Sequence, residues 1–222
     1  MTKKLHLKDW NPFRESTFVM GMTQTSKTFT VKILTKLLTS SKRPVIVFDP
    51  NRRWTQKLNK MEIAFSPENV IHNMHDIHAR GLCIVQPRHG EKWRESTFEA
   101  FCNKITSMFD SGHFVVVIDE LHNFITTFSA NDAFKELAKN CHNWDVGYIA
   151  IMQRPQEGIK AVFANASHLI TFRLKWAGDY KIMKMMLGEN HADRLFISSP
   201  NRLSQHNGLY QNPNGDIKEF ES

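Results

Sequence analysis

The sequence has few cysteines and lacks any long hydrophobic run. Its three cysteines, Cys83, Cys102 and Cys141, are odd in number and widely spaced, and they form no CxxC pair. This pattern argues against a disulfide framework or a zinc ribbon and favours a reducing compartment. The longest strongly apolar run, Phe114–Ile118, is far too short to span a bilayer. The basic amino-terminal residues lack the apolar stretch of a signal peptide, so we expect a cytoplasmic chain.

Internal repeats, low-complexity tracts and linkers rich in proline or glycine are also missing from the sequence. We therefore expect a basic tail over residues 1–15 and a single domain over 16–222. The hydrophobic fraction of 41%, with 16 Phe, 5 Trp and 3 Tyr, is enough for a sizeable core. Acidic residues number 22 against 29 Lys and Arg, a net charge of +7. This balance favours an anionic partner, such as nucleic acid, nucleotide or a lipid headgroup, without choosing among them.

Short apolar segments alternate with segments of helical periodicity. Strands are predicted over Thr17–Met20, Val45–Phe48, Leu82–Val85, Phe114–Ile118, Tyr148–Met152 and His168–Leu174. Helices are predicted over Lys27–Leu38, Trp93–Phe109, Ala130–Asn140 and Asp179–Met186. Several strands are apolar at consecutive positions, which is typical of strands covered on both faces. The alternation predicts an α/β fold with a mostly parallel sheet flanked by helices, and a turn at Asn212–Gly215 predicts a C-terminal β-hairpin.

The first predicted strand leads into a loop with the spacing of a phosphate-binding P-loop. The loop residues are Gly21, Met22, Thr23, Gln24, Thr25, Ser26, Lys27 and Thr28, and a predicted helix follows. Backbone N–H groups of such a loop wrap phosphates at a helix N-terminus, Lys27 would neutralise the β- and γ-phosphates, and Thr28 would ligate Mg²⁺. Ser26 replaces the second glycine of the pattern, which costs roughly 1–2 kcal/mol if that position needs a left-handed backbone. A polar helix cap with an exposed Lys27 is the alternative interpretation.

A second motif supports nucleotide hydrolysis. The apolar strand Phe114–Ile118 ends in two adjacent carboxylates, Asp119 and Glu120, which is the form of a Walker B element. Asp119 would hold Mg²⁺ through water, and Glu120 would orient and polarise the attacking water as general base. An acidic helix cap is the alternative for these residues taken alone. The acid pair argues against a small-molecule kinase, because such an enzyme must exclude water.

A third element suggests a family. The strand Gly147–Met152 ends in Gln153-Arg154-Pro155-Gln156, where a polar side chain could reach the γ-phosphate or its attacking water. With the P-loop, the acid pair and an Asp-Pro at the end of Val45–Pro50, this order resembles the FtsK/HerA superfamily of ring-forming, DNA-translocating P-loop ATPases. The resemblance covers most of the chain and implies a RecA-like P-loop NTPase fold, with ATP and Mg²⁺ as cofactors. It also implies that Gln153 couples the γ-phosphate to subunit movement.

The same resemblance implies an arginine from the neighbouring subunit that stabilises charge in the transition state. The candidate for this trans arginine is Arg88, with Arg80 and Arg94 as alternatives and Arg173 as a weaker one.

The size of the chain indicates which members of the superfamily it resembles most, because the ATPase core accounts for nearly all 222 residues. Such a stripped core resembles the genome-packaging ATPases of icosahedral viruses with an internal membrane. That resemblance implies double-stranded DNA as partner, a pentameric or hexameric ring, and contacts with capsid-vertex or virion-membrane proteins. It also implies a location in the host cytoplasm or with the virion. Two alternatives stay open: an ATPase for protein or filament export, and a non-catalytic nucleotide- or DNA-binding module with a degenerate P-loop.

Other features carry weaker signals. Basic clusters that could contact DNA phosphates, or form solvated faces, are Lys3-Lys4-Lys8, Arg52-Arg53-Lys57-Lys60 and Lys175-Lys181-Lys184. The spacing of His72, His75 and His78 could align three imidazoles along a helix, but a metal site is disfavoured because no matching ligands accompany them. Trp54 could stack on an adenine base or be a half-buried core residue.

Overall fold

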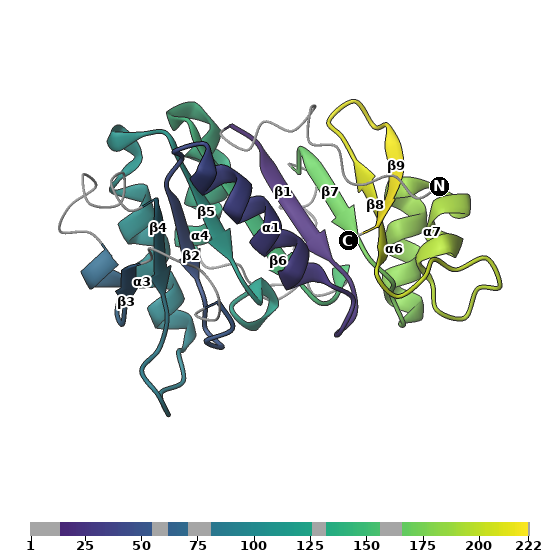
Figure 1. Ribbon diagram of the computed structural model, residues 1–222, viewed down its shortest axis with the longest axis horizontal. Helices are drawn as coiled ribbons and strands as arrows, with labels where there is room; N and C mark the ends of the chain where they lie inside the picture. Colours follow the sequence, from purple (N-terminus) through teal and green to yellow (C-terminus); the bar gives the residue numbers. More distant parts are fainter. Residues whose placement is uncertain (1–13, 55–61, 71–80, 126–131, 156–165, 222) are drawn as a thin grey trace.

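A mixed β-sheet runs through the whole molecule (Figure 1). The computed structural model describes residues 14–54, 62–70, 81–125, 132–155 and 166–221, and all structural statements concern these residues. Their nine strands form one sheet in the order β3-β4-β2-β5-β6-β1-β7-β8-β9. The strands are β1 (Ser16–Met20), β2 (Val45–Phe48), β3 (Glu62–Ala64), β4 (Leu82–Val85), β5 (Phe114–Ile118), β6 (Val146–Met152), β7 (His168–Thr171), β8 (Asn207–Gln211) and β9 (Ile217–Glu221).

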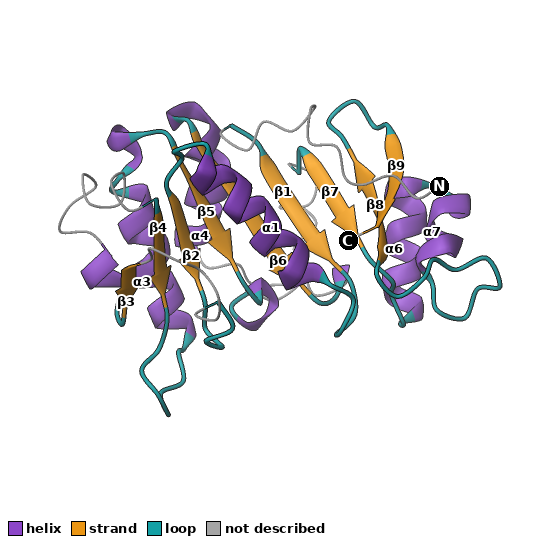
Figure 2. Ribbon diagram, in the orientation of Figure 1, coloured by secondary structure: helices purple, strands orange, loops and turns teal. Residues whose placement is uncertain are grey.

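Strand direction confirms the predicted architecture. All pairs from β3 through to β7 are parallel, whereas β8 is antiparallel to both β7 and β9. The sheet is thus mostly parallel and ends in the expected C-terminal hairpin. The α-helices are α1 (Lys27–Ser40), α3 (Glu95–Thr106), α4 (Asp132–Asn140), α6 (Ala177–Leu187) and α7 (Glu189–Leu195). In Figure 2, α1 lies in front of the sheet and the other four lie behind it.

The two faces of the sheet bury different kinds of side chain. On the α1 face, aliphatic residues such as Val115 and Val117 of β5 form a cluster with Leu34 of α1. On the opposite face the core is rich in aromatic rings, and Phe48 of β2 packs against Phe101 of α3 with ring centroids 4.7 Å apart. Successive strand residues point to opposite faces, so strands covered by helices on both sides read as continuous apolar runs.

Several element bounds differ from the predictions. The strand β7 ends at Thr171, and beyond it Leu174 forms an isolated bridge with Phe196. The short β3 and the helix α7 were not predicted, because three residues are too few to show a period and α7 follows α6 almost directly. Gly188 separates these two helices with φ 82°, a left-handed conformation that glycine adopts at little cost. No helix among the described residues is long and apolar enough to cross a bilayer.

Candidate nucleotide-binding site

The predicted motifs converge at the carboxyl edge of the sheet. The P-loop follows β1, the acid pair follows β5, and Gln153 follows β6, which lies between those two strands. Because these strands are parallel, their carboxyl ends meet at one edge. A pocket of about 170 Å³ at this edge is lined by Thr23, Gln24, Thr25, Ser26, Lys27, Thr28, Phe29, Arg53, Glu120 and Gln153.

The P-loop has a tightly determined backbone. Gly21 has φ 149°, and a Cβ at this position would lie 2.7 Å from the Cβ of Phe172. The Met22 amide donates to the carbonyl of Arg173 at 2.8 Å, and the Thr25 hydroxyl donates to the Met22 carbonyl at 2.7 Å. Left-handed and right-handed residues in succession turn backbone N–H groups toward a common concavity that suits an anion.

Ser26 adopts a left-handed conformation, with φ 65° and ψ 10°. This is the conformation in which serine was expected to cost free energy relative to glycine. Gln24 is also left-handed, with φ 66°. Ser26 is the N-cap residue of α1, yet its side chain makes no capping hydrogen bond to the helix. Lys27 is only 8% exposed. The alternative interpretation, a polar cap beside an exposed lysine, is therefore wrong.

Lys27 is held inside the loop that would bind phosphate. Its Nζ donates to the Met22 carbonyl at 2.7 Å. Burial lowers the pKa of Lys27 to about 8, although the nearby carboxylates of Glu120 and Asp119 act in the opposite direction. A buried ammonium in a concave loop has few of its water contacts left, so an anionic ligand would gain much from binding there.

Asp119 is fully buried, and both carboxylate oxygens accept hydrogen bonds. Oδ1 accepts from the Glu120 amide and Oδ2 from Nε1 of Trp54, each at 3.0 Å. Burial raises the pKa of Asp119 to about 6 despite the Trp54 hydrogen bond. The exposure of Trp54 is 0%, so its ring cannot stack on an adenine base. The alternative, a core residue, is confirmed, although Trp54 is fully rather than half buried.

Glu120 is the centre of a polar network. The Nη1 of Arg53 lies 2.5 Å from its Oε1, while Nε2 of Gln153 donates to Oε2 at 3.0 Å. Nε2 of His122 lies 3.2 Å from the same Oε2. The amide oxygen of Gln153 accepts from the Thr23 hydroxyl at 3.2 Å. A hydrogen-bonded chain thus connects the P-loop to Glu120 through Gln153.

Arg53, Trp54 and His122 are site residues that the sequence analysis missed in these roles. The loop after β2 brings two of them to the acid pair, because the Asp49 carboxylate accepts from the amides of Arg53 at 3.0 Å and Trp54 at 2.8 Å. Burial raises the pKa of Asp49, and these hydrogen bonds oppose that rise. The available signal was the Asp-Pro at the end of a buried strand, where parallel strands present functional loops.

The donor set suits Mg²⁺ held together with phosphate. Thr28 lines the pocket, and the buried Asp119 carboxylate accepts hydrogen bonds from two neutral donors, the Trp54 indole and the Glu120 amide. A hydroxyl and a carboxylate are the hard oxygen ligands that Mg²⁺ prefers, with substrate phosphates completing its coordination. Among the described residues no cluster of three or more His, Cys, Asp or Glu could hold a metal by itself. The residues present therefore fit Mg²⁺ as a companion of the nucleotide.

The arginine candidates lie in different places. Arg88 and Arg94 are exposed on the loop between β4 and α3, which Figure 1 shows projecting from the carboxyl edge. Arg173 is half-buried behind the P-loop, and Arg80 lies outside the described residues. The first two thus sit several strands from the P-loop of their own chain.

The basic clusters and the histidine series are described only in part. Residues 1–13, 55–61 and 71–80 lie outside the described ranges, which removes Lys3-Lys4-Lys8, Lys57, Lys60 and all three histidines. Lys184 pairs with Glu189 at 2.5 Å. Lys175 and Arg154 flank the exposed ring of Trp176, at 5.6 and 5.2 Å from its centroid. These two cations line a second pocket, which shares Thr23 and Gln153 with the first.

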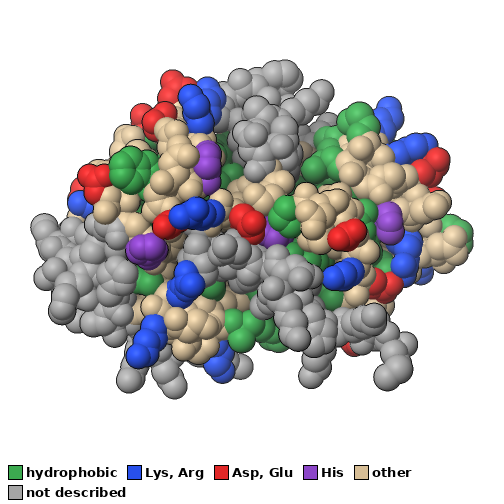
Figure 3. Space-filling model, turned by 90° about the horizontal axis from the view of Figure 1, so that it is seen from above, with side chains coloured by type: hydrophobic (Ala, Val, Ile, Leu, Met, Phe, Trp, Pro, Cys, Tyr) green, Lys and Arg blue, Asp and Glu red, His purple; other side chains and the backbone are tan. Residues whose placement is uncertain are grey.

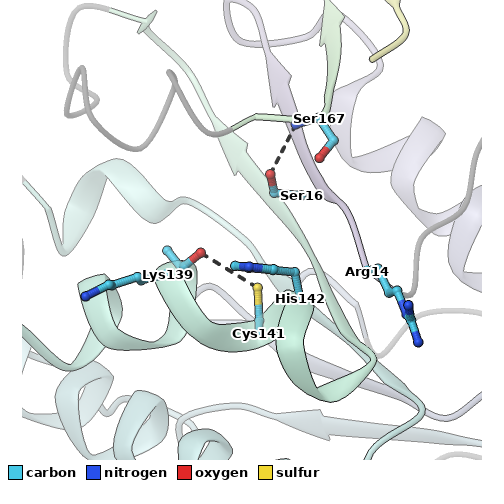
Figure 4. Close-up of a pocket in the computed structure, with 7 residues that line it drawn as sticks. Arg14, Ser16, Lys139, Cys141, His142 and Ser167 are labelled. Atoms are coloured by element: carbon cyan, nitrogen blue, oxygen red, sulfur yellow. Dashed lines mark hydrogen bonds between the residues drawn. The ribbon is translucent and has the colours of Figure 1, made fainter. Parts of the chain in front are cut away.

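A larger cavity of about 400 Å³ lies at the opposite, amino edge of the sheet. Figure 4 shows its lining, with Arg14 and Ser16 at β1, Ser167 before β7, and Cys141 and His142 after α4. Figure 3 looks onto this edge, where cationic and acidic side chains are interspersed among the described residues. Size favours this cavity, but the P-loop, acid pair and Gln153 all lie at the other edge, so we place the functional site there.

No protein-family model and no curated protein matches the sequence. Solved structures do match it. The genome packaging NTPase B204 from Sulfolobus turreted icosahedral virus 2, in complex with ATP-γS, superposes with a TM-score of 0.76 at 17% identity, covering 95% of this chain and 98% of that chain. VirB4 of Thermoanaerobacter pseudethanolicus superposes with a TM-score of 0.66 at 10% identity, covering 93% of this chain and 88% of that chain.

A third match is the pCW3 conjugation coupling protein TcpA, with a TM-score of 0.61 at 13% identity, covering 94% of this chain and 60% of that chain. The chain has the fold of the FtsK/HerA-type P-loop ATPases. In this FtsK/HerA-type fold, the P-loop, the acid pair and Gln153 lie at one edge of the sheet. Hydrogen bonds connect Thr23 of the P-loop to Gln153, and Gln153 to Glu120 of the acid pair.

Proposed function

We propose that this chain is an ATP-hydrolysing DNA translocase that works as a genome-packaging motor, driving double-stranded DNA into a viral capsid. The observation that carries the proposal is the hydrogen-bonded chain from Thr23 through Gln153 to Glu120, which ties the P-loop to the candidate base. The likeness to a genome packaging NTPase over nearly the full length of both chains supports packaging in particular.

Nucleotide binding follows from the P-loop and its lysine. The β- and γ-phosphates of ATP replace the Met22 carbonyl as partner of the Lys27 ammonium, and the loop N–H groups wrap the β-phosphate. Thr28 and Asp119 would hold Mg²⁺, and the ion would supply positive charge that neutralises the phosphate oxygens. A phosphate beside Lys27 raises its lowered pKa, so the ammonium stays charged in the complex.

Hydrolysis uses Glu120 as the base. The carboxylate takes a proton from water, the water oxygen bonds to the γ-phosphorus, and the bond from that phosphorus to the β–γ bridging oxygen breaks, releasing ADP. Gln153 senses the γ-phosphate because it contacts both the P-loop and Glu120. The Arg53 guanidinium pairs with the Glu120 carboxylate, and the Arg53 side chain is half exposed. A phosphate that attracts this guanidinium therefore frees Glu120 to act as the base.

Self-association is the second part of the proposal. The outer face of α1 carries Phe29, Ile33 and Leu37 at four-residue spacing, with exposed fractions of 56%, 44% and 46%. Phe29 also lines the P-loop pocket, so a subunit covering this stripe would lie beside the nucleotide. In a pentameric or hexameric ring, that neighbour supplies the trans arginine. Arg88 is our candidate, with Arg80 and Arg94 as alternatives.

The remaining partners follow from charge and from the packaging role. A net charge of +7 suits contact with DNA phosphates. Capsid-vertex or virion-membrane proteins would anchor the ring, in the host cytoplasm or at the virion. Two other functions are the rival outcomes: an export ATPase, and a non-catalytic nucleotide- or DNA-binding module.

The test combines phosphate release with the oligomer mass in solution. We expect ATP hydrolysis that linear double-stranded DNA stimulates several-fold, and a ring mass that Ile33→Asp reduces to monomer. Lys36→Ala, on the same helix, is the control for the mass. A rate of ATP hydrolysis that DNA does not change would favour the export ATPase. Nucleotide binding without any phosphate release would favour the non-catalytic module.

A further inference from the structure

The segment between α7 and β8 reaches back to the P-loop. Leu203 anchors this segment, because its side chain is only 4% exposed and its amide donates to the carbonyl of Arg194 at 2.8 Å. β8 begins four residues later at Asn207. The next residue, Gly208, packs so closely that a Cβ would lie 2.8 Å from the ring of Phe220. The three residues between the buried leucine and the strand are therefore held at both ends.

Two of these residues contact the P-loop. Nε2 of Gln205 donates to the backbone carbonyl of Gln24 at 3.1 Å. Nδ1 of His206 lies 2.7 Å from Oγ of Ser26, and either atom can be the donor, depending on the imidazole tautomer. The contacts span some 180 positions of sequence, so only the tertiary fold brings them about.

The contacted residues share an unusual backbone. Gln24 and Ser26 are the P-loop residues other than glycine with positive φ, at 66° and 65°. Side chains with a Cβ adopt this region at a cost, and a loop made of them tends to relax to other conformations. Relaxation would turn the N–H groups of the loop away from the concavity that suits a phosphate.

We propose that Gln205 and His206 form a brace that holds Gln24 and Ser26 in the phosphate-binding conformation and takes the place of the missing P-loop glycine. Both are positioning residues, since they act through the loop backbone. The Cβ of Ser26 disfavours the left-handed conformation. The hydroxyl of the same side chain contacts His206, which holds Ser26 in that conformation. The inference rests on the proposed function in one respect, that the loop binds nucleotide phosphate.

The experiment compares ADP affinity in four proteins: wild type, His206→Ala, Ser26→Gly and the double variant. Loss of one ordinary hydrogen bond corresponds to about a fivefold weaker Kd, which we expect for His206→Ala in the Ser26 background. In the Ser26→Gly background the same change should alter Kd by less than about twofold, because glycine needs no brace. Equal weakening in both backgrounds, or none in either, overturns the proposal.

Two further variants separate the brace from general damage. His206→Asn places an amide atom where Nδ1 lies, and should restore most of the lost affinity. Ser204→Ala, an exposed position in the same segment, is the matched control and should leave Kd unchanged, because the hydrogen bonds to the P-loop come from Gln205 and His206.

Backbone hydrogen exchange tests the brace without any nucleotide. The amides of residues 24–28 should exchange faster in His206→Ala than in wild type, and this difference should vanish in the Ser26→Gly background. Unchanged exchange overturns the brace even if ADP binds well. The opposite outcome is also informative. If His206→Ala exchanges faster than wild type but wild type binds neither ADP nor ATP, the proposed function is contradicted, while the structural role of Gln205 and His206 is supported.

Discussion

The two edges of the sheet hold charge in opposite ways. At the carboxyl edge, Lys27, Asp119 and Glu120 are 8%, 0% and 4% exposed, and burial shifts the pKa of the first two toward their neutral forms. At the amino edge, Arg14 pairs with Asp145 in solvent, with 67% of its side chain exposed. Burying charge costs free energy that solvated pairs do not pay. The carboxyl edge is therefore suited to a ligand whose charges complete it, which the amino edge does not require.

Lys27→Ala is the strongest way to break this contrast. It removes the buried cation from the P-loop, and we expect nucleotide binding to be lost, as measured by calorimetry with ADP and ATP. The control is Lys36→Ala, which removes an exposed lysine from the same helix. Binding at near wild-type affinity would show that the P-loop assignment is wrong.

Glu120→Gln leaves the shape of the carboxyl edge nearly intact and removes its base. ATP binding should persist while phosphate release falls by about 100-fold or more. Glu99→Gln, an exposed position on α3, is the matched control and should hydrolyse ATP like wild type. Unchanged turnover in Glu120→Gln would exclude this residue as the base.

Asp119→Asn sharpens the comparison through pH. The folded-state pKa of Asp119, about 6, lies above its ordinary 3.8, so between these values the native state binds the extra proton and the free energy of unfolding falls as pH rises. The variant lacks this penalty. Without Mg²⁺ or nucleotide, the free energy of unfolding of Asp119→Asn relative to wild type should therefore rise by about 2 kcal/mol from about pH 4 to about pH 7.

Urea unfolding of Asp119→Asn and wild type across this range measures the difference. Asp49 and Lys27 are present in both proteins, so their contributions to the pH dependence of the stability difference largely cancel. What does not cancel is the part that depends on their interaction with the Asp119 charge. A stability difference that does not change with pH would show that burial of Asp119 carries no such cost.

Arg14→Ala should have the smallest effect. An exposed ion pair contributes little, because water solvates both partners and salt screens them. We expect the thermal midpoint, followed by circular dichroism at low and high salt, to stay nearly unchanged. A large loss of stability would mean that the Arg14–Asp145 pair contributes more to the free energy of unfolding than its exposure indicates, which would weaken the contrast between the two edges.

Much of the site could be predicted because its motifs are contiguous. The eight residues from Gly21 to Thr28, the Asp119–Glu120 pair and Gln153 each stand at the end of a recognisable strand. The mostly parallel sheet and its C-terminal hairpin were also predicted, and parallel strands align their carboxyl ends, which explains why the motifs meet at one edge. Arg53 and His122 did not stand out, because a polar residue in a loop carries no local sign of what it contacts across the fold.

What the sequence by itself determined is the alternation of strand and helix and the spacing of the three motifs, because periodicity and turn chemistry act over a few neighbouring residues. Only the tertiary structure decided which groups surround Glu120, that Trp54 is buried against Asp119, and that His206 meets Ser26. Those contacts join residues far apart in the chain, and they arise because the packed sheet brings its carboxyl-edge loops into register. The departure of Ser26 from glycine is a property of the sequence, and its proposed compensation by Gln205 and His206 is a property of the fold.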